Sequence, residues 1–572
     1  MSKETPAYEE WKVHSVKSEA IVKKFKDIIE ELKGATTAEE AIKAMKAYEK
    51  YGDKITDNFA TIALNYTLDT RDKKNIKNQE AIDKAMPEVQ AATLPYAEAV
   101  LSSPFRAEIE KKFGSLYLTM LEYQVKSFSP ELVELAQKEN DLTSKYDALK
   151  SQAVVHFEGK EYGLGQIGAF YGDKDRNRRK AAHDAAIEAV NAIAPELEDI
   201  YDQLVKIRNE KAHKLGFSSY SDLSYFIMGR YDYDRKEVEG YREQIHEIVT
   251  PLVEKIAKDE AKALGLKALS YEDLEVYYPE GSPLPHGTTE EKVARAQEMY
   301  DRMGEETGSF FRFMVAKHLL FLDAKPGKAL GGYMNYFPVK KCPIIFSNFN
   351  GTSGDVDVLT HEFGHAFQSY LARNIKIPEY RCPTMDGAEI DSMSMEFFAW
   401  PYMDLFFDEP DKYRYQHLAS AIVFLPYGVT VDEFQHWVYD HPEASKEDRR
   451  AAWKEIEAKY TPYKSKAYEG AGYLGDGLRW VMQGHIFSSP FYYIDYTLAQ
   501  VVAFEFLALD RKNHEKAWKK YAKLCKMGGK YPFQHLVTKA GLVSPLKEGA
   551  LKKVMSPVKK ILKEEEEKAY RG

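Results

Sequence analysis

The amino-acid sequence predicts a mainly α-helical protein with one small β-sheet. Three observations support this fold class: apolar residues recur at helical spacing within charged segments, alternating strand patterns are scarce, and a single stretch is rich in aromatic and β-branched residues. The chain has 572 residues, of which 44% are hydrophobic and 13% aromatic. At roughly 150 residues per domain, this length corresponds to about four domain equivalents. The apolar content suffices for a large buried core.

Helices are expected throughout the first third of the chain. Between residues 18 and 33 the apolar side chains recur at steps of three and four, and Gly34 follows as a helix stop. Thr37 and Glu40 have the spacing of a capping box, which predicts the start of a second helix. Three further segments are similarly charged and amphipathic, near residues 104–127, 129–150 and 173–213.

One region has a different character. Residues 331–352 combine aromatic and β-branched side chains between glycines and prolines, which predicts a short hairpin or small sheet. An ordered loop is the alternative. Residues 277–289 are rich in proline and glycine, and we expect them to connect two helices.

Composition excludes several classes of protein. Lys and Arg number 80 against 89 Asp and Glu, a formal net charge of −9, which argues against nucleic acid as a partner. Three widely spaced cysteines exclude a disulfide framework and favour a reducing compartment. The polar first residues predict no signal peptide, and no apolar run reaches the ~18 residues of a membrane span. We therefore expect a cytoplasmic protein that binds neither membranes nor nucleic acid.

The sequence His-Glu-Phe-Gly-His at residues 361–365 carries the strongest chemical signal. Residues four apart lie on the same face of a helix, so the imidazoles of His361 and His365 can bind one ion. Zinc accepts imidazole nitrogen in tetrahedral geometry, and Glu362 can take a proton from the activated water. Two buried histidines satisfied by other partners are the alternative. Gly364 inside this helix costs ~1 kcal/mol relative to alanine, which predicts a closely packed neighbour.

A catalytic zinc ion needs a third protein ligand and one open position. Glu389, Ser392 and Glu396 share one face of a predicted second helix. Glu389 could therefore reach the ion, while Ser392 and Glu396 could hold a ligand imidazole by its other nitrogen. Asp391 is the rival ligand. The alternative is an ordinary amphipathic helix whose Met and Phe side chains lie in the core.

A third cluster follows near the C-terminus. His485 precedes three tyrosines, Tyr492, Tyr493 and Tyr496, and hydroxyl and imidazole groups are suitable donors to the oxyanion of peptide hydrolysis. Because the chain has 39 tyrosines, ordinary packing is the competing interpretation.

These three motifs, in this order, resemble the oligoendopeptidase F branch of the thimet-oligopeptidase family, particularly its Pz-peptidase-like members. The resemblance implies a mainly α, two-lobed helical peptidase with a deep central channel and a small β-sheet beside the zinc-binding helix. It implies an N-terminal helical lobe over residues 1–180 and a catalytic region over 181–572. It further implies one Zn²⁺ ion held by His361, His365 and Glu389, Glu362 as general base, Glu396 as a supporting acid, and His485, Tyr493 and Tyr496 as stabilisers of the tetrahedral intermediate.

The predicted function is zinc-dependent endopeptidase activity on short oligopeptides. A zinc carboxypeptidase or dipeptidase of similar fold is the closest alternative, and it would need a cationic residue such as Arg479 or Lys340 for the substrate carboxylate. A metal-dependent peptide-binding protein without turnover is the alternative outside enzymes, although the intact Glu362 argues against it. Which of Tyr492, Tyr493 and Tyr496 stabilises the oxyanion stays open at this level.

Overall fold

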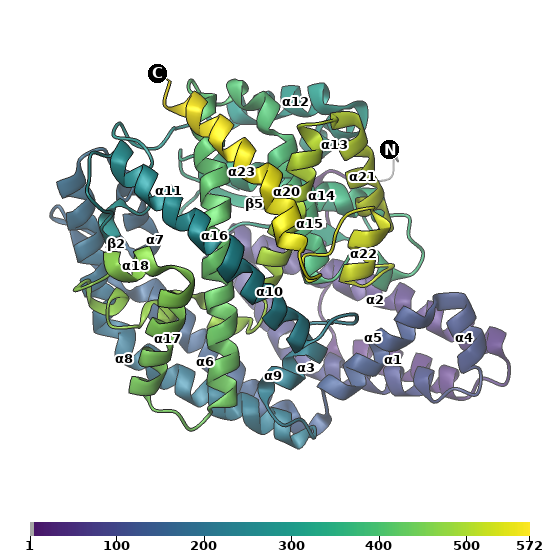
Figure 1. Ribbon diagram of the computed structural model, residues 1–572. Helices are drawn as coiled ribbons and strands as arrows, with labels where there is room; N and C mark the ends of the chain where they lie inside the picture. The colour runs from purple at the N-terminus through teal and green to yellow at the C-terminus, as the bar shows by residue number, and fades with distance from the viewer. Residues whose placement is uncertain (1–4, 572) are drawn as a thin grey trace.

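The computed structural model describes residues 5–571 and is mainly helical, as predicted (Figure 1). The helices before the large sheet are α1 (Ser18–Lys33), α2 (Ala38–Leu68), α3 (Lys73–Leu101), α4 (Arg106–Phe113), α5 (Ser115–Ser127), α6 (Val133–Gln152), α7 (Leu164–Ile167), α8 (Arg176–Lys214), α9 (Tyr220–Ile227), α10 (Arg235–Ile248), α11 (Thr250–Ala263), α12 (Thr289–Met303) and α13 (Glu305–Ala316).

The remaining helices follow this sheet in the sequence. They are α14 (Gly354–Ala372), α15 (Met385–Phe398), α16 (Pro410–Asp440), α17 (Lys446–Tyr460), α18 (Pro462–Ala467), α19 (Gly484–Ser488), α20 (Tyr493–Asp510), α21 (His514–Met527), α22 (Phe533–Lys539) and α23 (Ala550–Ala569). No helix within residues 5–571 is both long enough and apolar enough to cross a membrane.

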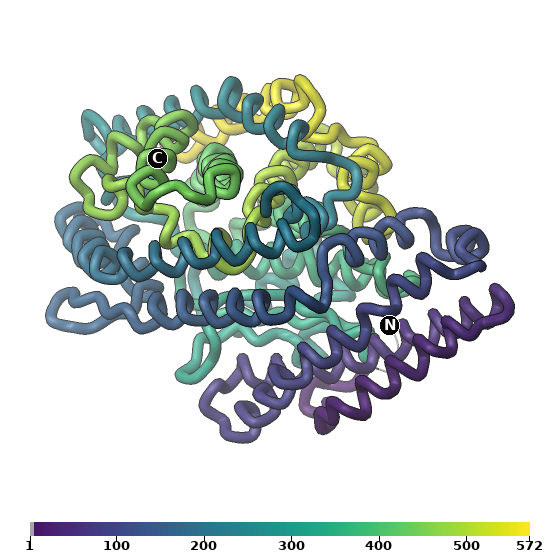
Figure 2. The backbone as a smooth tube through the Cα atoms, turned by 90° about the horizontal axis from the view of Figure 1, so that it is seen from below, coloured from purple at the N-terminus to yellow at the C-terminus, as the bar shows by residue number. Residues whose placement is uncertain are grey.

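The N-terminal helices lie along one side of the molecule (Figure 2). Helix α1 spans the residues predicted for it, and its apolar side chains are buried against α2 and α3. Thr37 accepts a hydrogen bond from the backbone N–H of Glu40 at 3.2 Å, as expected. The Glu40 carboxylate, however, accepts from Thr36 rather than from Thr37, so the capping box is shifted by one residue.

Two smaller apolar clusters stabilise this N-terminal side, whereas the largest cluster draws mainly on residues from Val190 onward. The predicted boundary at residue 180 falls inside α8 (Arg176–Lys214). Division into an N-terminal lobe and a catalytic region therefore stays a prediction.

The small sheet predicted near residues 331–352 is present. Its strands are β3 (Leu320–Asp323), β4 (Tyr333–Phe337) and β5 (Cys342–Phe349), in the order β3-β5-β4. β4 pairs with β5 as an antiparallel hairpin and β3 joins β5 in parallel. β5 is therefore central and contacts α14, while β4 lies at one edge of the sheet.

A second hairpin, β1 (Val154–Phe157) and β2 (Lys160–Gly163), was not anticipated from the sequence. Its two-residue turn, Glu158-Gly159, has positive φ at both positions, 49° and 73°. This geometry suits the right-handed twist of a hairpin, and glycine adopts it without steric cost.

The position of the candidate site depends on how closely α14 and α15 cross. Helix α15 packs between α14 and α20, and Gly364 of α14 meets the backbone of α15. A Cβ atom at Gly364 would lie 2.5 Å from the carbonyl oxygen of Asp391 and 2.6 Å from Cα of Ser392. The absence of a side chain is therefore what permits this close approach, and it explains a glycine inside a buried helix.

Gly364→Ala should destabilise the protein by about 1–3 kcal/mol, the usual cost of overpacking a core. Gly52→Ala in α2 is a matched control, because a Cβ there meets nothing within 4 Å. That control should be neutral or stabilising by up to about 1 kcal/mol. Thermal unfolding of both variants measures the difference. Equal melting temperatures would show that the contact between α14 and α15 does not require glycine.

Candidate metal centre

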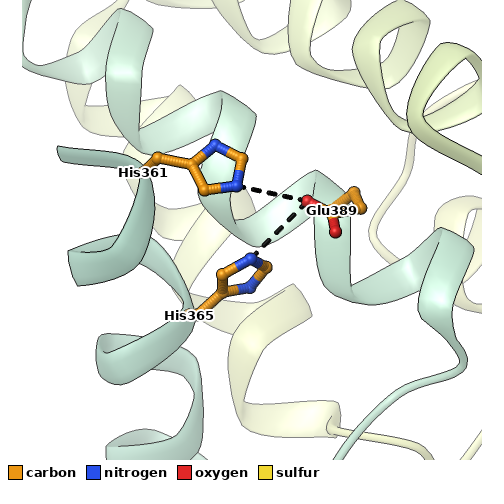
Figure 3. Close-up of side chains that lie close together, drawn as sticks. All are labelled: His361, His365 and Glu389. Atoms are coloured by element: carbon orange, nitrogen blue, oxygen red, sulfur yellow. Dashed lines mark ion pairs between the residues drawn. The ribbon is translucent and has the colours of Figure 1, made fainter. Parts of the chain in front are cut away.

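His361 and His365 project from α14 toward the carboxylate of Glu389 on α15 (Figure 3). Nε2 of His361 lies 3.4 Å from Oε2 of Glu389, and Nε2 of His365 lies 3.5 Å from the same oxygen. Ligand atoms of these three residues all lie within 4.8 Å of one another. The spacing of four residues on one helix and the crossing of a second helix thus bring together two nitrogens and one oxygen that could hold a single metal ion.

Glu389 is held in place by two hydroxyl groups. Ser392, one helical turn later, donates to Oε2 at 3.0 Å, and the phenol of Tyr492 donates to Oε1 at 2.7 Å. Burial opposes ionisation of this carboxyl group, yet His365 and His361 hold the pKa of Glu389 well below its usual range. The carboxylate is therefore ionised and oriented toward the imidazoles.

The second nitrogen of His361 is fixed by Glu396. Nδ1 lies 2.7 Å from Oε1 of Glu396, and the other carboxylate oxygen lies 2.8 Å from Nε2 of His417. Burial raises the pKa of Glu396, but its bonds to the two histidines lower it to about 2. His417 lies on α16 and accepts from the indole N–H of Trp400 at 3.1 Å. No local motif marks His417, so the sequence offered no signal for it.

The surroundings of His361 favour positive charge. Burial disfavours the imidazolium, but hydrogen bonds to Glu389 and Glu396 raise the pKa of His361 well above its usual value. Two buried carboxylates facing the same ring therefore create a negative environment. Such an environment compensates the desolvation of a cation, which otherwise costs several kcal/mol.

Glu362 is 8% exposed and follows the first histidine on α14. Burial raises the pKa of Glu362, and the two imidazoles and the backbone N–H of Met334 partly oppose this shift. Met334 belongs to β4, the edge strand. A carboxylate of raised basicity thus lies between the imidazole pair and a sheet edge.

Asp391, the rival ligand, faces a different environment. Its Oδ1 accepts from the thiol of Cys525 at 3.2 Å, on α21. Burial raises the pKa of Asp391 well above its usual range. The structure therefore brings Glu389, and not Asp391, to the two histidines.

The C-terminal cluster borders the same place. His485 is the second residue of α19, and its Nε2 lies 3.5 Å from the phenol oxygen of Tyr496 in the first turn of α20. Tyr492 contacts Glu389 directly, as described above. The ring of Tyr493 lies 5.0 Å from that of His485 and 5.7 Å from that of Tyr496, and it also packs against Phe424 and Tyr427 of α16, at 5.6 and 5.7 Å between centroids.

The tyrosines therefore occupy different positions. Tyr496, whose ring centroid is 4.8 Å from that of Tyr492, faces the imidazole of His485 and lies within the electrostatic influence of Glu389 and Glu362. Burial raises the pKa of Tyr496 to about 12, so its hydroxyl stays protonated and can donate.

Sequence comparison relates the chain to a known protein family. The profile of the Peptidase M3 N-terminal domain matches residues 8–128, and that of Peptidase family M3 matches residues 306–556. The structure is similar to that of Pz peptidase A with inhibitor 2, with 41% sequence identity and a TM-score of 0.93 over 97% of this chain and 99% of that chain. The chain belongs to peptidase family M3.

Other relatives agree with this membership. A putative oligoendopeptidase F from Bacillus anthracis str. Ames is 40% identical, with a TM-score of 0.88 and 98% of both chains covered. Oligopeptidase PepF of Bacillus subtilis (strain 168) is 25% identical over 375 residues, which are 64% of this chain and 48% of that protein. The match thus spans about half the length of this curated relative. The resemblance and the mainly α fold predicted from the sequence are both confirmed.

His361→Ala should abolish stoichiometric zinc binding, because it removes one of the three candidate ligands, the one whose position Glu396 fixes. His156→Ala is the control, since His156 is exposed in β1, away from these three residues. Elemental analysis of the purified variants, dialysed against the same zinc buffer, measures the difference. Equal zinc content in the two variants would exclude His361 from the ligand set.

Proposed function

We propose that this member of peptidase family M3 is a zinc-dependent endopeptidase that hydrolyses internal bonds of short oligopeptides. The observation that carries the proposal is the convergence of His361, His365 and Glu389 directly beside Glu362. Names of similar proteins, Pz peptidase A and oligoendopeptidase F, describe peptidases and support the same substrate class.

The donor set fits zinc. Two imidazole nitrogens and one carboxylate oxygen are a common ligand set of catalytic zinc sites, which keep a fourth position for water or substrate. Glu396 and Ser392 orient ligands from behind, and such supporting contacts are typical of zinc centres. Cobalt or manganese could bind the same donors, since ligand type alone is only moderately selective.

The bound ion would polarise the scissile carbonyl and lower the pKa of the attacking water toward about 7. Glu362 accepts the proton of that water and passes it to the leaving amine. Its burial raises its basicity, which suits a group that must accept and then release a proton near neutral pH.

Tyr496 and His485 are suited to stabilise the negative oxygen of the tetrahedral intermediate. The Tyr496 hydroxyl and Nε2 of His485 lie 3.5 Å apart, and the charge of Glu389 acts on both groups. Burial lowers the pKa of His485, which favours a neutral imidazole whose N–H donates without carrying full charge. The ring of Tyr493 lies against that of His485, at 5.0 Å, and against Tyr427 of α16, so we assign it a supporting role beside these two donors.

The edge strand β4 would align the substrate. Its outer edge is unpaired among the strands of this sheet, and an extended peptide can add to such an edge through backbone hydrogen bonds. Met334 of this strand lies beside Glu362, so a peptide added there would pass the general base. Recognition of extended backbone selects flexible peptides over folded proteins.

The exopeptidase alternative requires a free cation near the site. Lys340 is unsuited to this role, because it forms an ion pair with Asp57 of α2 and contacts Thr61 at 3.0 Å. Arg479 is paired with Glu457 at 2.9 Å, and it lines a cavity whose lining includes none of the three candidate metal ligands. Binding of internal peptide segments therefore fits the centre better than capture of a terminus next to the cleaved bond.

An internally quenched peptide blocked at both ends should be cleaved by the zinc-loaded enzyme and protected after chelation. Glu362→Gln should retain zinc and lose about 10²–10⁴-fold in turnover, the usual contribution of a proton-transferring group. Fluorescence, mass spectrometry of products and elemental analysis measure these results together. Cleavage only of peptides with a free terminus would contradict the endopeptidase assignment, and full activity of the variant would remove Glu362 from the mechanism.

Tyr496→Phe should lower kcat by about 10²–10³-fold with little change in KM, as loss of one oxyanion donor does. Tyr492→Phe is the matched comparison, because its hydroxyl holds the zinc ligand Glu389 instead. That variant should weaken zinc affinity by about 10–100-fold. Steady-state kinetics at saturating zinc, together with competition against a chelator, separates the two roles. A loss of kcat in Tyr492→Phe and of zinc affinity in Tyr496→Phe would exchange the roles of the two tyrosines.

A further inference from the structure

A cavity of about 290 Å³ is lined by Gln483, which contacts Nδ1 of His485, whereas Nε2 of that imidazole faces Tyr496. Its walls come from α8, α16, α18 and the segments around residues 271–275 and 473–483. Lys464 and Arg479 contribute positive charge to it, and Tyr427, Tyr468 and Tyr473 contribute aromatic surface. At about 30 Å³ per water molecule, this space can hold a group the size of an amino-acid residue.

Hydrogen bonds connect the cavity to the catalytic cluster. Gln483 lines the cavity, and its amide contacts Nδ1 of His485 at 2.8 Å. The phenol of Tyr427 donates to Oε1 of Gln483 at 2.8 Å, and its ring also contacts Tyr493. Through Gln483 and Tyr427 the cavity therefore adjoins His485 and Tyr493 of the C-terminal cluster.

Lys464 has an unusual environment. Its ammonium group makes no ion pair or hydrogen bond within residues 5–571. It forms cation–π contacts with the rings of Tyr463 and Tyr427, at 5.9 and 6.0 Å from the ring centroids. Burial, assisted by the charge of Arg479, lowers the pKa of Lys464 to about 7. An arriving anion would supply the missing partner and favour the charged form.

Arg479 is held in one orientation but, within the described part of the chain, keeps N–H donors free for a further acceptor. Its guanidinium lies 4.0 Å above the ring of Tyr427, and one nitrogen donates to buried Glu457 at 2.9 Å. Arginine has five N–H donors in a planar fork that matches a carboxylate. Stacking on Tyr427 and pairing with Glu457 thus hold the fork in place beside the cavity.

We propose that this cavity binds the C-terminal carboxylate of the peptide substrate through Lys464 and Arg479. The inference rests on the proposed function and specifies its substrate: peptides whose C-terminus lies a fixed, short distance beyond the cleaved bond. A terminal carboxylate is the one anion that every unmodified peptide carries, whereas acidic side chains vary in position. The distance from the metal centre to the cavity then limits which bond is cut.

Glu275 provides an internal test of this charge balance. It lines the same cavity, and its negative charge opposes that of a bound carboxylate. Loss of hydration raises the pKa of Glu275, which weakens but does not remove this opposition. Replacing it by the neutral amide should therefore favour the bound anion, a change opposite in direction to loss of Lys464.

The experiment compares peptides that differ only at the C-terminus, free acid against amide, with one to six residues beyond the cleaved bond. The zinc-loaded enzyme should cleave the acid with about 10-fold higher kcat/KM at one preferred length, the usual strength of a hydrogen bond between charged groups. Lys464→Met should reduce this acid-to-amide ratio toward one. Glu275→Gln should increase it, and Lys466→Met, an exposed neighbour on α18, should leave it unchanged.

Equal cleavage of acid and amide at every length would overturn the proposal, as would an equal fall for both peptides in Lys464→Met. If an amidated peptide with Asp at the terminal position were cleaved as fast as the free acid, the cavity would not be specific for the terminal carboxylate. Fluorescence anisotropy with the Glu362→Gln enzyme measures the same ratio as an affinity, without turnover. An enzyme that hydrolyses no peptide but binds the acid preferentially would refute the proposed function and support the cavity, so the two failures are distinguishable.

Discussion

The candidate site depends on the close crossing of two buried helices. Gly364 leaves room for the backbone of α15 against α14, and this approach carries the Glu389 carboxylate to within 3.5 Å of two imidazole nitrogens. Buried charges are tolerated only when they are paired and hydrogen-bonded. Here Glu389 and Glu396 each contact two histidines, and hydroxyl groups bond to both carboxylate oxygens of Glu389.

The electrostatic environment gives the three glutamates of the site different properties. Glu389 and Glu396 are held ionised by the histidines, whereas burial raises the pKa of Glu362. Carboxylates in neighbouring positions thus acquire opposite properties, since two serve as stable anions and one as a stronger base. Burial also raises the pKa of Tyr496. The environment of each group, rather than its chemical type, determines which task it can perform.

Sequence reasoning reached much of this arrangement because its signals are local. The helix at Ser18–Lys33, the hairpin near residue 340 and the shared face of Glu389, Ser392 and Glu396 all follow from periodicity within one segment. The parallel strand β3 and the residues His417 and Gln483 were missed. Each acts through partners from other segments, and no short motif marks such contacts.

By itself, the sequence determined the helical class, the two histidines one turn apart and the adjacent glutamate, because helix geometry links spacing to direction. Only the tertiary structure decided that Glu389 and not Asp391 faces the histidines, and that Tyr492 bonds to Glu389 while Tyr493 and Tyr496 pack against His485. Neighbouring residues on one helix point in different directions. Which of them meets a given site depends on how the helix rotates and packs, and that depends on the whole core.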